Sequence, residues 1–480
     1  MANFDMLSIS PDLVLIAFAM LFLLIGAFSR TTKVHNYNML SVIGFSLAIL
    51  LNLFLFGSKR FGFYNMMLYD ELAGIFRFIF YGIGILVSLI SDPYIEGRVR
   101  HKGEYYALIV LSIVGMSFIA TSYDLIMLVL GVEAMSLSVY ILAGMFKHDE
   151  TSVEASIKYF LLGAFSTAIM LLGIAFIYGT LGTTNYSLIV ENYNKYLNNG
   201  LQTGIFLVGV SAVLAGVLFK IAAVPFHMWT PDVYEGAPTS VTAFMISGIK
   251  AASFFMLLRV FLVALKVSVF NLVGVMVFIS IITMTLGNVA ALTQKSIKRM
   301  LAYSSIAHAG YMLIGFVALN KTGMAAIVFY LIAYALMNIG AFAVLVLLEE
   351  KGKNLENVSG CGFLYPFLGL MMTIFMFSMV GLPPTGGFMG KFYIFRGALE
   401  AGYLWLVIIA VLNSAISAYF YLRVLVYMFF EKPVDTGGVL RFSSPTVTTA
   451  LIITSLGVLA LGIFPQVFFE LTTKYMTYLP

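Results

Sequence analysis

The chain has 480 residues, of which 61% are hydrophobic and only 10% are charged, and its mean hydropathy is +1.00. This balance excludes an ordinary soluble domain and predicts an all-α polytopic membrane protein. The net charge of +5 fits basic loops on one side of a membrane and gives no indication of nucleic-acid binding.

Cysteine and histidine usage argues against a bound cofactor. The single cysteine, Cys361, excludes an internal disulfide and cannot supply the four thiolates of an iron–sulfur cluster. The five histidines show no metal-ligand spacing, and no haem-attachment motif is present. We therefore expect neither a metal nor a cofactor in this chain.

The apolar runs follow one another along the whole chain. The first 11 residues include Asp5 and lack a basic region, so the first run is expected to be a retained span and not a cleaved signal. A membrane helix needs about 20 apolar residues, which predicts about fourteen spans here. They lie near 12–28, 39–57, 72–91, 105–121, 123–145, 155–179, 204–229, 239–265, 269–292, 299–319, 323–348, 362–402, 404–430 and 447–472.

The loops between these spans predict an orientation. Lys and Arg are about twice as frequent on one set of alternate loops as on the other, and cytoplasmic loops are the richer set. This bias places both chain ends on the outer side of the membrane. The outer segment that begins at Thr183 is long enough for a small surface helix but not for a domain.

Two of the runs are interrupted. The run 204–238 contains three prolines close to Lys220, and the run 362–402 contains GLPPTGGFMGK at 381–391. Unwound backbone survives in a membrane only where it lines water or is buried in protein. Two broken helices about five spans apart predict two inverted five-helix repeats.

The predicted units follow from these interruptions. Residues 1–104 form three N-terminal helices, 105–268 the first repeat, with its broken helix near 220–238, 269–430 the second repeat, with its broken helix near 381–391, and 431–480 the last helix.

Five ionisable residues fall within the predicted spans and are candidates for function, because a charge at membrane depth is costly. Glu133, Lys220 and Lys250 lie near the middle of their spans. Lys391 follows the second interruption, and Lys158 lies only a few residues inside its span, where it could equally reach the membrane surface. A carboxylate and several amines on separate helices indicate charge transfer more than solute binding, since the charge of one group changes the proton affinity of the next.

Two histidines and four arginines give weaker indications of a functional role. His308, near mid-depth, could pass a proton or be a hydrogen-bonded packing residue, and the two interpretations are about equally supported. His227 lies beside Pro225 and could order water or cap the freed carbonyls. Arginine holds its proton at physiological pH, so the remaining candidates are expected to be structural and near an interface. They are Arg77, Arg259, Arg396 and Arg423.

Several motifs resemble those of a known family. They are GVEAMSLSVYIL (131–142), EASIKYFLLGA (154–164), FHMWTPDVYEGAP (226–238), KRMLAYSSIAHAGYM (298–312) and GFMGKFYIF (387–395). Together they resemble the N-type antiporter-like subunits of bacterial proton-pumping NADH:quinone oxidoreductases, known as complex I. The likeness covers nearly the whole chain, and the TPDVYEGAP segment, Lys391 and the short C-terminal part fit the N type.

The resemblance implies a role for each residue. It makes Glu133 and Lys158 a coupling pair, Lys220 the central lysine, Lys250 the connecting lysine and Lys391 the lysine of the second broken helix. It also implies that NADH, FMN, iron–sulfur clusters and quinone bind to partner subunits. Those partners would be an antiporter-like neighbour and the small quinone-side membrane subunits, all in the bacterial inner membrane.

Other functions stay open at this point. A subunit of a multi-subunit sodium/proton antiporter would share the HxWxPD core of the third motif. A purely structural subunit of a respiratory membrane arm would keep the lysines only as ion pairs. A solute transporter is the least supported class, because the sequence shows no cluster of hydrogen-bonding and aromatic residues around one cavity. The sequence also leaves open whether the electron donor is NADH or ferredoxin.

Overall fold

The computed structural model describes residues 5–28, 33–99, 101–196, 200–348, 352, 354–433 and 444–475. Within them, 13 helices are long and apolar enough to cross a membrane, or 14 if the bent pair Leu355–Leu364 and Pro366–Val380 counts as one span. The prediction of an all-α protein with about fourteen spans is confirmed. The predicted outer position of the chain ends concerns residues 1–4 and 476–480, which lie outside the described residues.

The first half of the chain contains one small sheet among its helices. Its elements are α1 (Ser10–Phe28), α2 (Val34–Leu55), β1 (Arg60–Gly62), β2 (Met67–Tyr69), α3 (Glu71–Ile95), α4 (Lys102–Thr121), α5 (Leu125–Ala143), α6 (Glu150–Leu181), α7 (Tyr186–Tyr196), α8 (Gly200–Ile221), α9 (Trp229–Gly236), α10 (Thr239–Phe244), the π-helical turn η1 (Met245–Ile249), α11 (Lys250–Arg259) and a second π-helical turn, η2 (Val260–Ala264). The two strands pair antiparallel.

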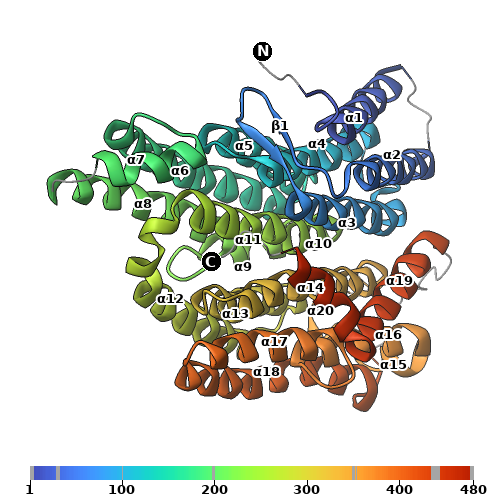
Figure 1. Ribbon diagram of the computed structural model, residues 1–480. Helices are drawn as coiled ribbons and strands as arrows, with labels where there is room; N and C mark the ends of the chain where they lie inside the picture. Colours follow the sequence, from blue (N-terminus) through green and yellow to red (C-terminus); the bar gives the residue numbers. More distant parts are fainter. Residues whose placement is uncertain are drawn as a thin grey trace.

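The second half is helical throughout its described residues. Its elements are α12 (Lys266–Leu292), α13 (Ile297–Val317), α14 (Lys321–Leu348), the 3₁₀ turn η4 (Leu355–Val358), α15 (Cys361–Leu364), α16 (Pro366–Val380), α17 (Gly386–Glu400), α18 (Leu404–Phe430), α19 (Pro445–Ile463) and α20 (Pro465–Lys474). Helices α1–α11 and α12–α18 occupy two neighbouring halves of the molecule (Figure 1).

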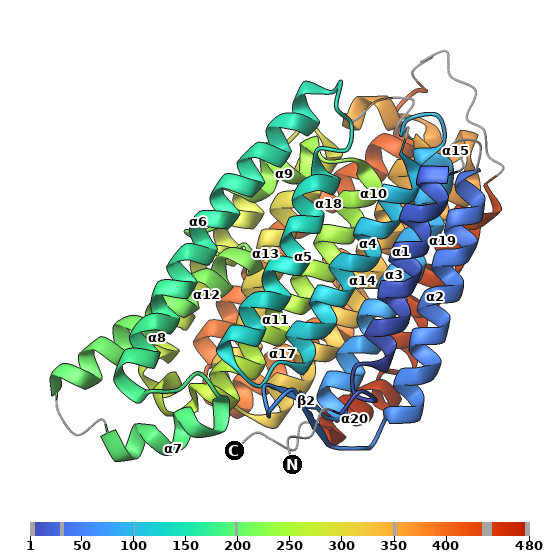
Figure 2. The same cartoon turned by 90° about the horizontal axis from the view of Figure 1, so that it is seen from above.

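The long helices run roughly parallel, and the short elements lie at the two ends of the bundle. The strand β2 and helices α7 and α20 lie at one end, and α9 and α15 lie at the other (Figure 2). The first broken helix therefore leads from the α7 end, through α8, to α9. The second leads from α15, through α16, to α17 near the opposite end (Figure 2). The two broken helices cross the bundle in opposite directions, as inverted repeats require.

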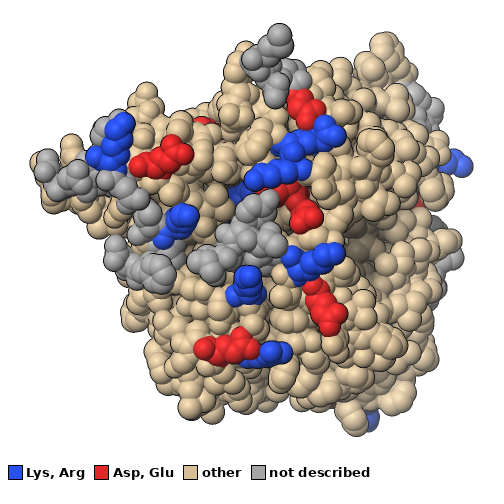
Figure 3. All heavy atoms as spheres, viewed as in Figure 1, with Lys and Arg blue, Asp and Glu red and all other residues tan. Residues whose placement is uncertain are grey.

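Charged side chains are sparse on the surface. In the face drawn in Figure 3 they are scattered singly or in small groups, with wide uncharged areas between them. The most buried spans are Thr239–Ala264 and Ile297–Val317. In each of them, 94% of the residues in the most apolar stretch are buried. These central helices carry Lys250 and His308.

The two breaks are shorter than the sequence suggests. In the first, helix α8 ends at Ile221 and α9 begins at Trp229, so only Pro225 of the three prolines lies in this break. Pro231 sits in the first turn of α9, where its missing N–H costs nothing, and Pro238 precedes α10.

The second break is limited to residues 381–385. Gly381 ends α16 with a left-handed backbone (φ 91°), and Thr385 caps α17 by accepting a hydrogen bond from the Phe388 amide. Lys391 therefore lies within the second half-helix and not in the break itself.

Three further details differ from or add to the sequence prediction. The predicted last span, 447–472, ends at Ile463 because Pro465 starts a separate helix, α20. The segment that begins at Thr183 forms a short helix, α7, as expected. The hairpin β1–β2 was not predicted, because three-residue strands carry almost no periodic signal.

Two of the arginines expected near an interface are buried. Arg77 donates to Asp12 Oδ2 at 2.6 Å and to Ser117 Oγ at 2.7 Å, and the Arg77 and Asp12 side chains are at most 1% exposed. Arg259 donates to Asp70 Oδ2 at 2.6 Å with similar burial. Each aspartate compensates the arginine charge, so these residues hold helices together and do not extend to the surface.

Replacing Asp12 with Ala would leave the Arg77 charge buried and uncompensated. We expect a loss of about 3–5 kcal/mol in the free energy of unfolding, since one partner of a buried pair has been removed. Thermal unfolding of the detergent-solubilised protein measures this loss. The paired change of Asp12 to Leu and Arg77 to Met serves as control and should be less destabilising, and equal stability of the single and double variants would contradict the interpretation.

Candidate functional site

Lys220 ends the first half of the first broken helix. Its side chain is buried, and its Nζ donates to Ser136 Oγ at 2.9 Å and to the Tyr140 hydroxyl at 3.3 Å. Both acceptors are on α5, and the amine also lies 5.6 Å from the centre of the Tyr140 ring. All of these contacts are to neutral groups, so the amine has no carboxylate within hydrogen-bond distance among the described residues.

Glu133 lies one turn before Ser136 on the same face of α5. Its Oε1 is buried and accepts no hydrogen bond from any described residue. The carboxylate interacts electrostatically with Lys220 and with Tyr140. A buried carboxylate oxygen without a partner is costly.

Lys158 does not contact Glu133 in this structure. Its Nζ lies 2.7 Å from Asp232 Oδ2 and 2.5 Å from Glu154 Oε1, and its side chain is 39% exposed. Asp232 belongs to α9, so this ion pair attaches helix α6 to the second half of the first broken helix. The predicted coupling pair is thus separated here, and Lys158 has two other carboxylates as partners.

Asp232 is the centre of this surface ion-pair cluster. Besides Lys158 it binds Arg299 Nη1 at 2.9 Å, and Arg299 also binds Glu235 at 2.8 Å. Asp232 lies outside the candidate spans. Partial burial raises the pKa of Asp232, but the hydrogen bonds from Lys158 and Arg299 outweigh it, so its pKa lies below the usual value.

The unwound segment after Lys220 is held by backbone contacts. Trp229 Nε1 donates to the Phe219 carbonyl at 3.2 Å, and the Val224 amide donates to Thr283 Oγ1 on α12 at 3.0 Å. His227 was expected to order water or to cap a freed carbonyl; it interacts with the backbone of Pro225, while Trp229 caps the Phe219 carbonyl. The buried Nδ1 of His227 has no hydrogen-bond partner among the described residues.

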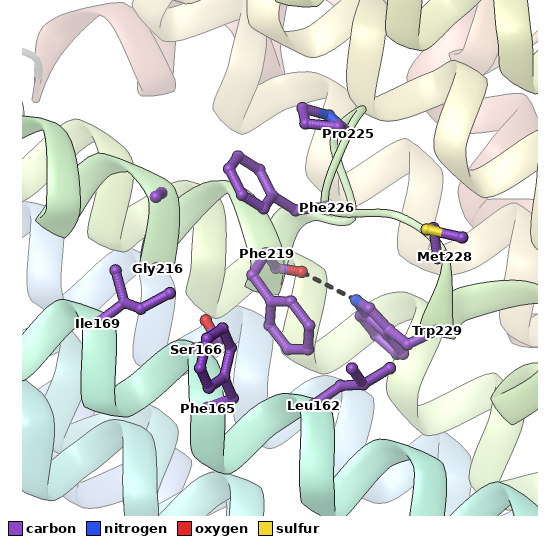
Figure 4. Close-up of a pocket in the computed structure, with 11 residues that line it drawn as sticks. Leu162, Phe165, Ser166, Ile169, Gly216, Phe219, Pro225, Phe226, Met228 and Trp229 are labelled. Carbon is purple, nitrogen blue, oxygen red and sulfur yellow. Dashed lines mark hydrogen bonds between the residues drawn. The ribbon is translucent and has the colours of Figure 1, made fainter.

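A cavity of about 180 Å³ lies beside this break, between α6 and α8. Its walls are almost entirely apolar, with Phe165, Phe219 and Phe226 among the lining residues (Figure 4). Lys220 is not among the lining residues, and its amine is bonded toward α5.

Lys250 follows directly after the π-helical turn η1, a feature often found at functional sites. It is 1% exposed, and its Nζ donates to the Ser305 carbonyl and to Ser305 Oγ, the latter at 3.1 Å. The amine also lies 5.6 Å from the centre of the Tyr334 ring. The span Thr239–Ala264 contains both π-helical turns, and the first of them lies directly before the lysine.

Lys391 points back across the second break. Its Nζ donates to the carbonyls of Met379 and Val380 at 3.1 and 2.8 Å, and to Ser414 Oγ on α18 at 2.9 Å. The two carbonyls belong to the last turn of α16, where the helix dipole attracts a positive charge. The left-handed backbone at Gly381 (φ 91°) favours glycine, and a Cβ there would also lie 3.2 Å from the Lys391 side chain.

His308 lies between these two lysines. Its Nδ1 is 2.6 Å from the Tyr330 hydroxyl and its Nε2 is 2.9 Å from the Tyr421 hydroxyl. It interacts electrostatically with both Lys250 and Lys391. The structure thus places Lys220 near Glu133 in the first half of the molecule. Lys250, on α11 of the same half, reaches across to Ser305 on α13, and His308 and Lys391 lie in the second half.

Some members of this arrangement were missed from the sequence. Lys298 is 4% exposed and donates to the Ala237 carbonyl after α9 at 2.7 Å, although its position next to a basic loop gave the appearance of a surface residue. Asp232 was also missed. Tyr330 and Tyr421 were missed because aromatic residues are common throughout the chain. No group of three or more potential metal ligands occurs among the described residues.

Comparison with known proteins agrees with the geometry. The family model described as "NADH:quinone oxidoreductase/Mrp antiporter, TM" matches residues 122–417. An NADH-quinone oxidoreductase subunit N from Trichlorobacter lovleyi is 44% identical over 465 residues, which cover 96% of this chain and 95% of the relative. An F420H2 dehydrogenase subunit N from Methanosarcina mazei is 37% identical over 98% of both chains.

Solved structures show the same fold. A chain of respiratory complex I from Thermus thermophilus has a TM-score of 0.81 and 32% identity, covering 96% of this chain and 99% of that one. A chain of the Mrp complex from Dietzia sp. has a TM-score of 0.87 but only 19% identity, over 99% and 98% of the two chains, and so shows the fold alone. The chain therefore belongs to the NADH:quinone oxidoreductase/Mrp antiporter family of membrane subunits, and within it to the subunit N group.

Proposed function

We propose that this chain is the proton-translocating subunit N of a membrane-bound NADH:quinone oxidoreductase, and that protons move through Glu133, Lys158, Lys220, Lys250, His308 and Lys391. The observation that supports this most is the bonding of the three buried lysines. Each amine contacts only hydroxyls, carbonyls and ring faces among the described residues, although each is at most 4% exposed.

Neutral partners suit a group that must change its charge. A carboxylate would hold the ammonium form permanently, whereas a hydroxyl can accept from an ammonium or donate to a free amine. Burial makes an unpaired ammonium costly, so the proton is released when a nearby charge changes. Lys220, Lys250 and Lys391 are therefore proposed as three successive proton carriers.

The coupling step is proposed to start at Glu133 and Lys158. In the arrangement seen here, Glu133 has a buried oxygen without a partner and Lys158 is bound to Asp232 and Glu154. Movement of Lys158 to Glu133 would neutralise the carboxylate that interacts with Lys220 and would release α9. Both effects act on the same broken helix, and the proton on Lys220 would then pass to Lys250 and Lys391.

The driving reaction is proposed to take place in partner subunits. NADH, FMN, iron–sulfur clusters and quinone would bind there, because this chain supplies neither a thiolate set nor, among the described residues, a group of potential metal ligands. The neighbours would be an antiporter-like subunit and the small quinone-side membrane subunits, in the inner membrane of a bacterium with both chain ends outside.

A sodium/proton antiporter subunit is the second candidate. The Mrp chain from Dietzia sp. supports it through the shared fold only, whereas the subunit N relatives share 37–44% of their residues with this chain. A structural subunit in which the lysines serve only as ion pairs is less well supported, since the three lysines form no ion pair among the described residues.

Replacing Lys220 with Ala tests the relay. We expect the complex to assemble but to lose most of its proton pumping, because the central carrier is gone. Inverted membrane vesicles with NADH as electron donor measure pumping and quinone reduction, and native gels measure assembly. Lys266→Ala, which changes an exposed lysine, is the control, and an assembled Lys220→Ala complex with normal pumping would show that the relay is wrong.

Replacing Lys220 with Arg separates charge from proton exchange. Arginine keeps its proton at all physiological pH values, so this variant retains the positive charge but cannot release a proton. We expect pumping to fall as far as in Lys220→Ala, with assembly preserved. Pumping close to that of the unchanged complex would mean that only the charge is needed.

Replacing Asp232 with Asn tests the alternative partner of Lys158. The neutral amide holds Lys158 less tightly, so the lysine should move toward Glu133 and the coupling should change. We expect an altered ratio of protons pumped to NADH oxidised. Glu235→Gln, which weakens the same cluster without touching Lys158, is the matched control. Equal ratios in both variants and the unchanged complex would contradict the role of Asp232.

A further inference from the structure

The imidazole of His308 is bonded on both of its nitrogens by tyrosine hydroxyls from two different helices. Tyr330 is on α14 and Tyr421 is on α18, and the distances to the ring nitrogens are 2.6 and 2.9 Å. The Tyr421 hydroxyl also makes a short hydrogen bond with Ser304 Oγ. All four side chains are at most 1% exposed, so they form an unbroken buried chain from Ser304 through Tyr421 and His308 to Tyr330.

Each end of this chain lies next to a lysine of the proposed relay. At one end, Ser304 is the neighbour of Ser305, which accepts from Lys250 Nζ. At the other end, the Tyr330 ring packs against Gly390, the residue before Lys391, so closely that a Cβ at position 390 would lie 2.1 Å from the ring. The two ends of the chain therefore lie beside residues that adjoin the two lysines or their partners, and His308 in its centre interacts electrostatically with both amines.

Helix α18 adds a second contact with Lys391. Ser414, Ser417 and Tyr421 are spaced by three and four residues, which places them on one face of the helix. Ser414 accepts from Lys391 Nζ, and Ser417 donates to the Ser414 carbonyl at 2.6 Å. One helix thus presents hydroxyls both to Lys391 and to His308.

The chemistry of the chain allows protons to pass in steps. Neutral imidazole has one N–H donor and one acceptor nitrogen, and each hydroxyl can both donate and accept. When Ser304 donates to Tyr421, Tyr421 donates to His308 Nε2, and His308 Nδ1–H donates to Tyr330. In the opposite arrangement Tyr330 donates to Nδ1, Nε2–H donates to Tyr421, and Tyr421 donates to Ser304.

We propose that the hydroxyls of Tyr421 and Tyr330 carry protons between Lys250 and Lys391 through His308, so that this part of the path is built from side chains. The proposal rests on the proposed function and names further residues for it.

In one transfer, Lys250 loses one proton and Lys391 gains one. The Lys250 ammonium gives a proton to Ser304 after its flexible stem turns from the adjacent Ser305, and each following O–H or N–H bond breaks as the next one forms. The Tyr330 proton passes to the Lys391 amine. Lys250 ends as an amine and Lys391 as an ammonium. The transfer leaves the imidazole proton on Nε2. Before the next transfer the hydroxyls rotate and the imidazole ring turns about its Cβ–Cγ bond, so that its N–H again faces Tyr330 and no proton moves backwards.

A purely structural cluster would make a different prediction from a proton path. The three hydrogen bonds could serve only to satisfy buried polar atoms, and their loss would then cost stability without changing pumping in the complex that assembles. A proton path requires the hydroxyl hydrogens themselves, which phenylalanine lacks although it fills nearly the same volume.

The test replaces Tyr421 with Phe in the complete complex, in inverted vesicles. We expect assembly to be retained while the pumping rate falls by about tenfold or more, the scale on which a positioned proton-transfer group contributes. The solvent deuterium isotope effect on pumping should rise as well, because proton transfer in this segment becomes limiting. Tyr330→Phe is expected to have the same two effects.

Tyr105→Phe is the matched control. The Tyr105 hydroxyl is also buried and bonds two partners, Ser91 and Ser240, each at 2.8 Å, but it lies outside the proposed path. It should leave both the pumping rate and the isotope effect of the assembled complex unchanged. If Tyr421→Phe does not assemble, Ser304→Ala and Tyr330→Phe, each lacking one hydroxyl of the chain, decide the question.

The outcomes separate this inference from the proposed function. Normal pumping and an unchanged isotope effect in assembled Tyr421→Phe and Tyr330→Phe complexes, together with loss of pumping in Lys220→Ala, would overturn the tyrosine path alone. Normal pumping in Lys220→Ala as well would overturn both. A tenfold decrease in Tyr105→Phe equal to that in Tyr421→Phe would also overturn the inference, because the effect would not depend on the path.

Discussion

The arrangement of this protein depends on the cost of placing amines in a medium without water. Lys220, Lys250 and Lys391 are buried in a bundle whose surface is largely apolar, and none has a carboxylate partner among the described residues. Each is instead held by hydroxyls, carbonyls or aromatic rings, which can accommodate an ammonium or a free amine. The same cost is met differently at Arg77 and Arg259, where aspartates compensate a fixed charge.

The broken helices and π-helical turns serve these amines in three different ways. At the second break, the carbonyls that end α16 turn toward Lys391 and accept from it. At the first break, Lys220 comes before the unwound segment and reaches sideways to α5, while the segment itself is held by Trp229 and Thr283. Lys250 needs no break, because it follows a π-helical turn. Each of the three lysines therefore lies at or near irregular backbone, but the arrangement of lysine and backbone differs among the three.

The two halves of the molecule also differ in how their polar groups are connected. In the first half, Glu133, Ser136 and Tyr140 on one face of α5 surround the Lys220 amine, and Lys158 lies near the surface with Asp232. In the second half, hydroxyls from α13, α14 and α18 converge on His308. We propose that the first half senses a charge from a neighbour and responds by movement of Lys158, whereas the hydroxyls around His308 form a fixed route between Lys250 and Lys391.

The sequence by itself determined the class of protein, the number of spans, the positions of the two breaks to within a few residues, and the buried lysines, because hydropathy, proline and lone charges are local properties of the chain. Only the tertiary structure decided which side chains contact one another. Lys158 binds Asp232, which is 74 residues away, and His308 binds Tyr421, which is 113 residues away. Such contacts depend on how each helix is rotated about its own axis, and an apolar run of about 20 residues carries almost no information on that rotation when the helix is buried on most sides.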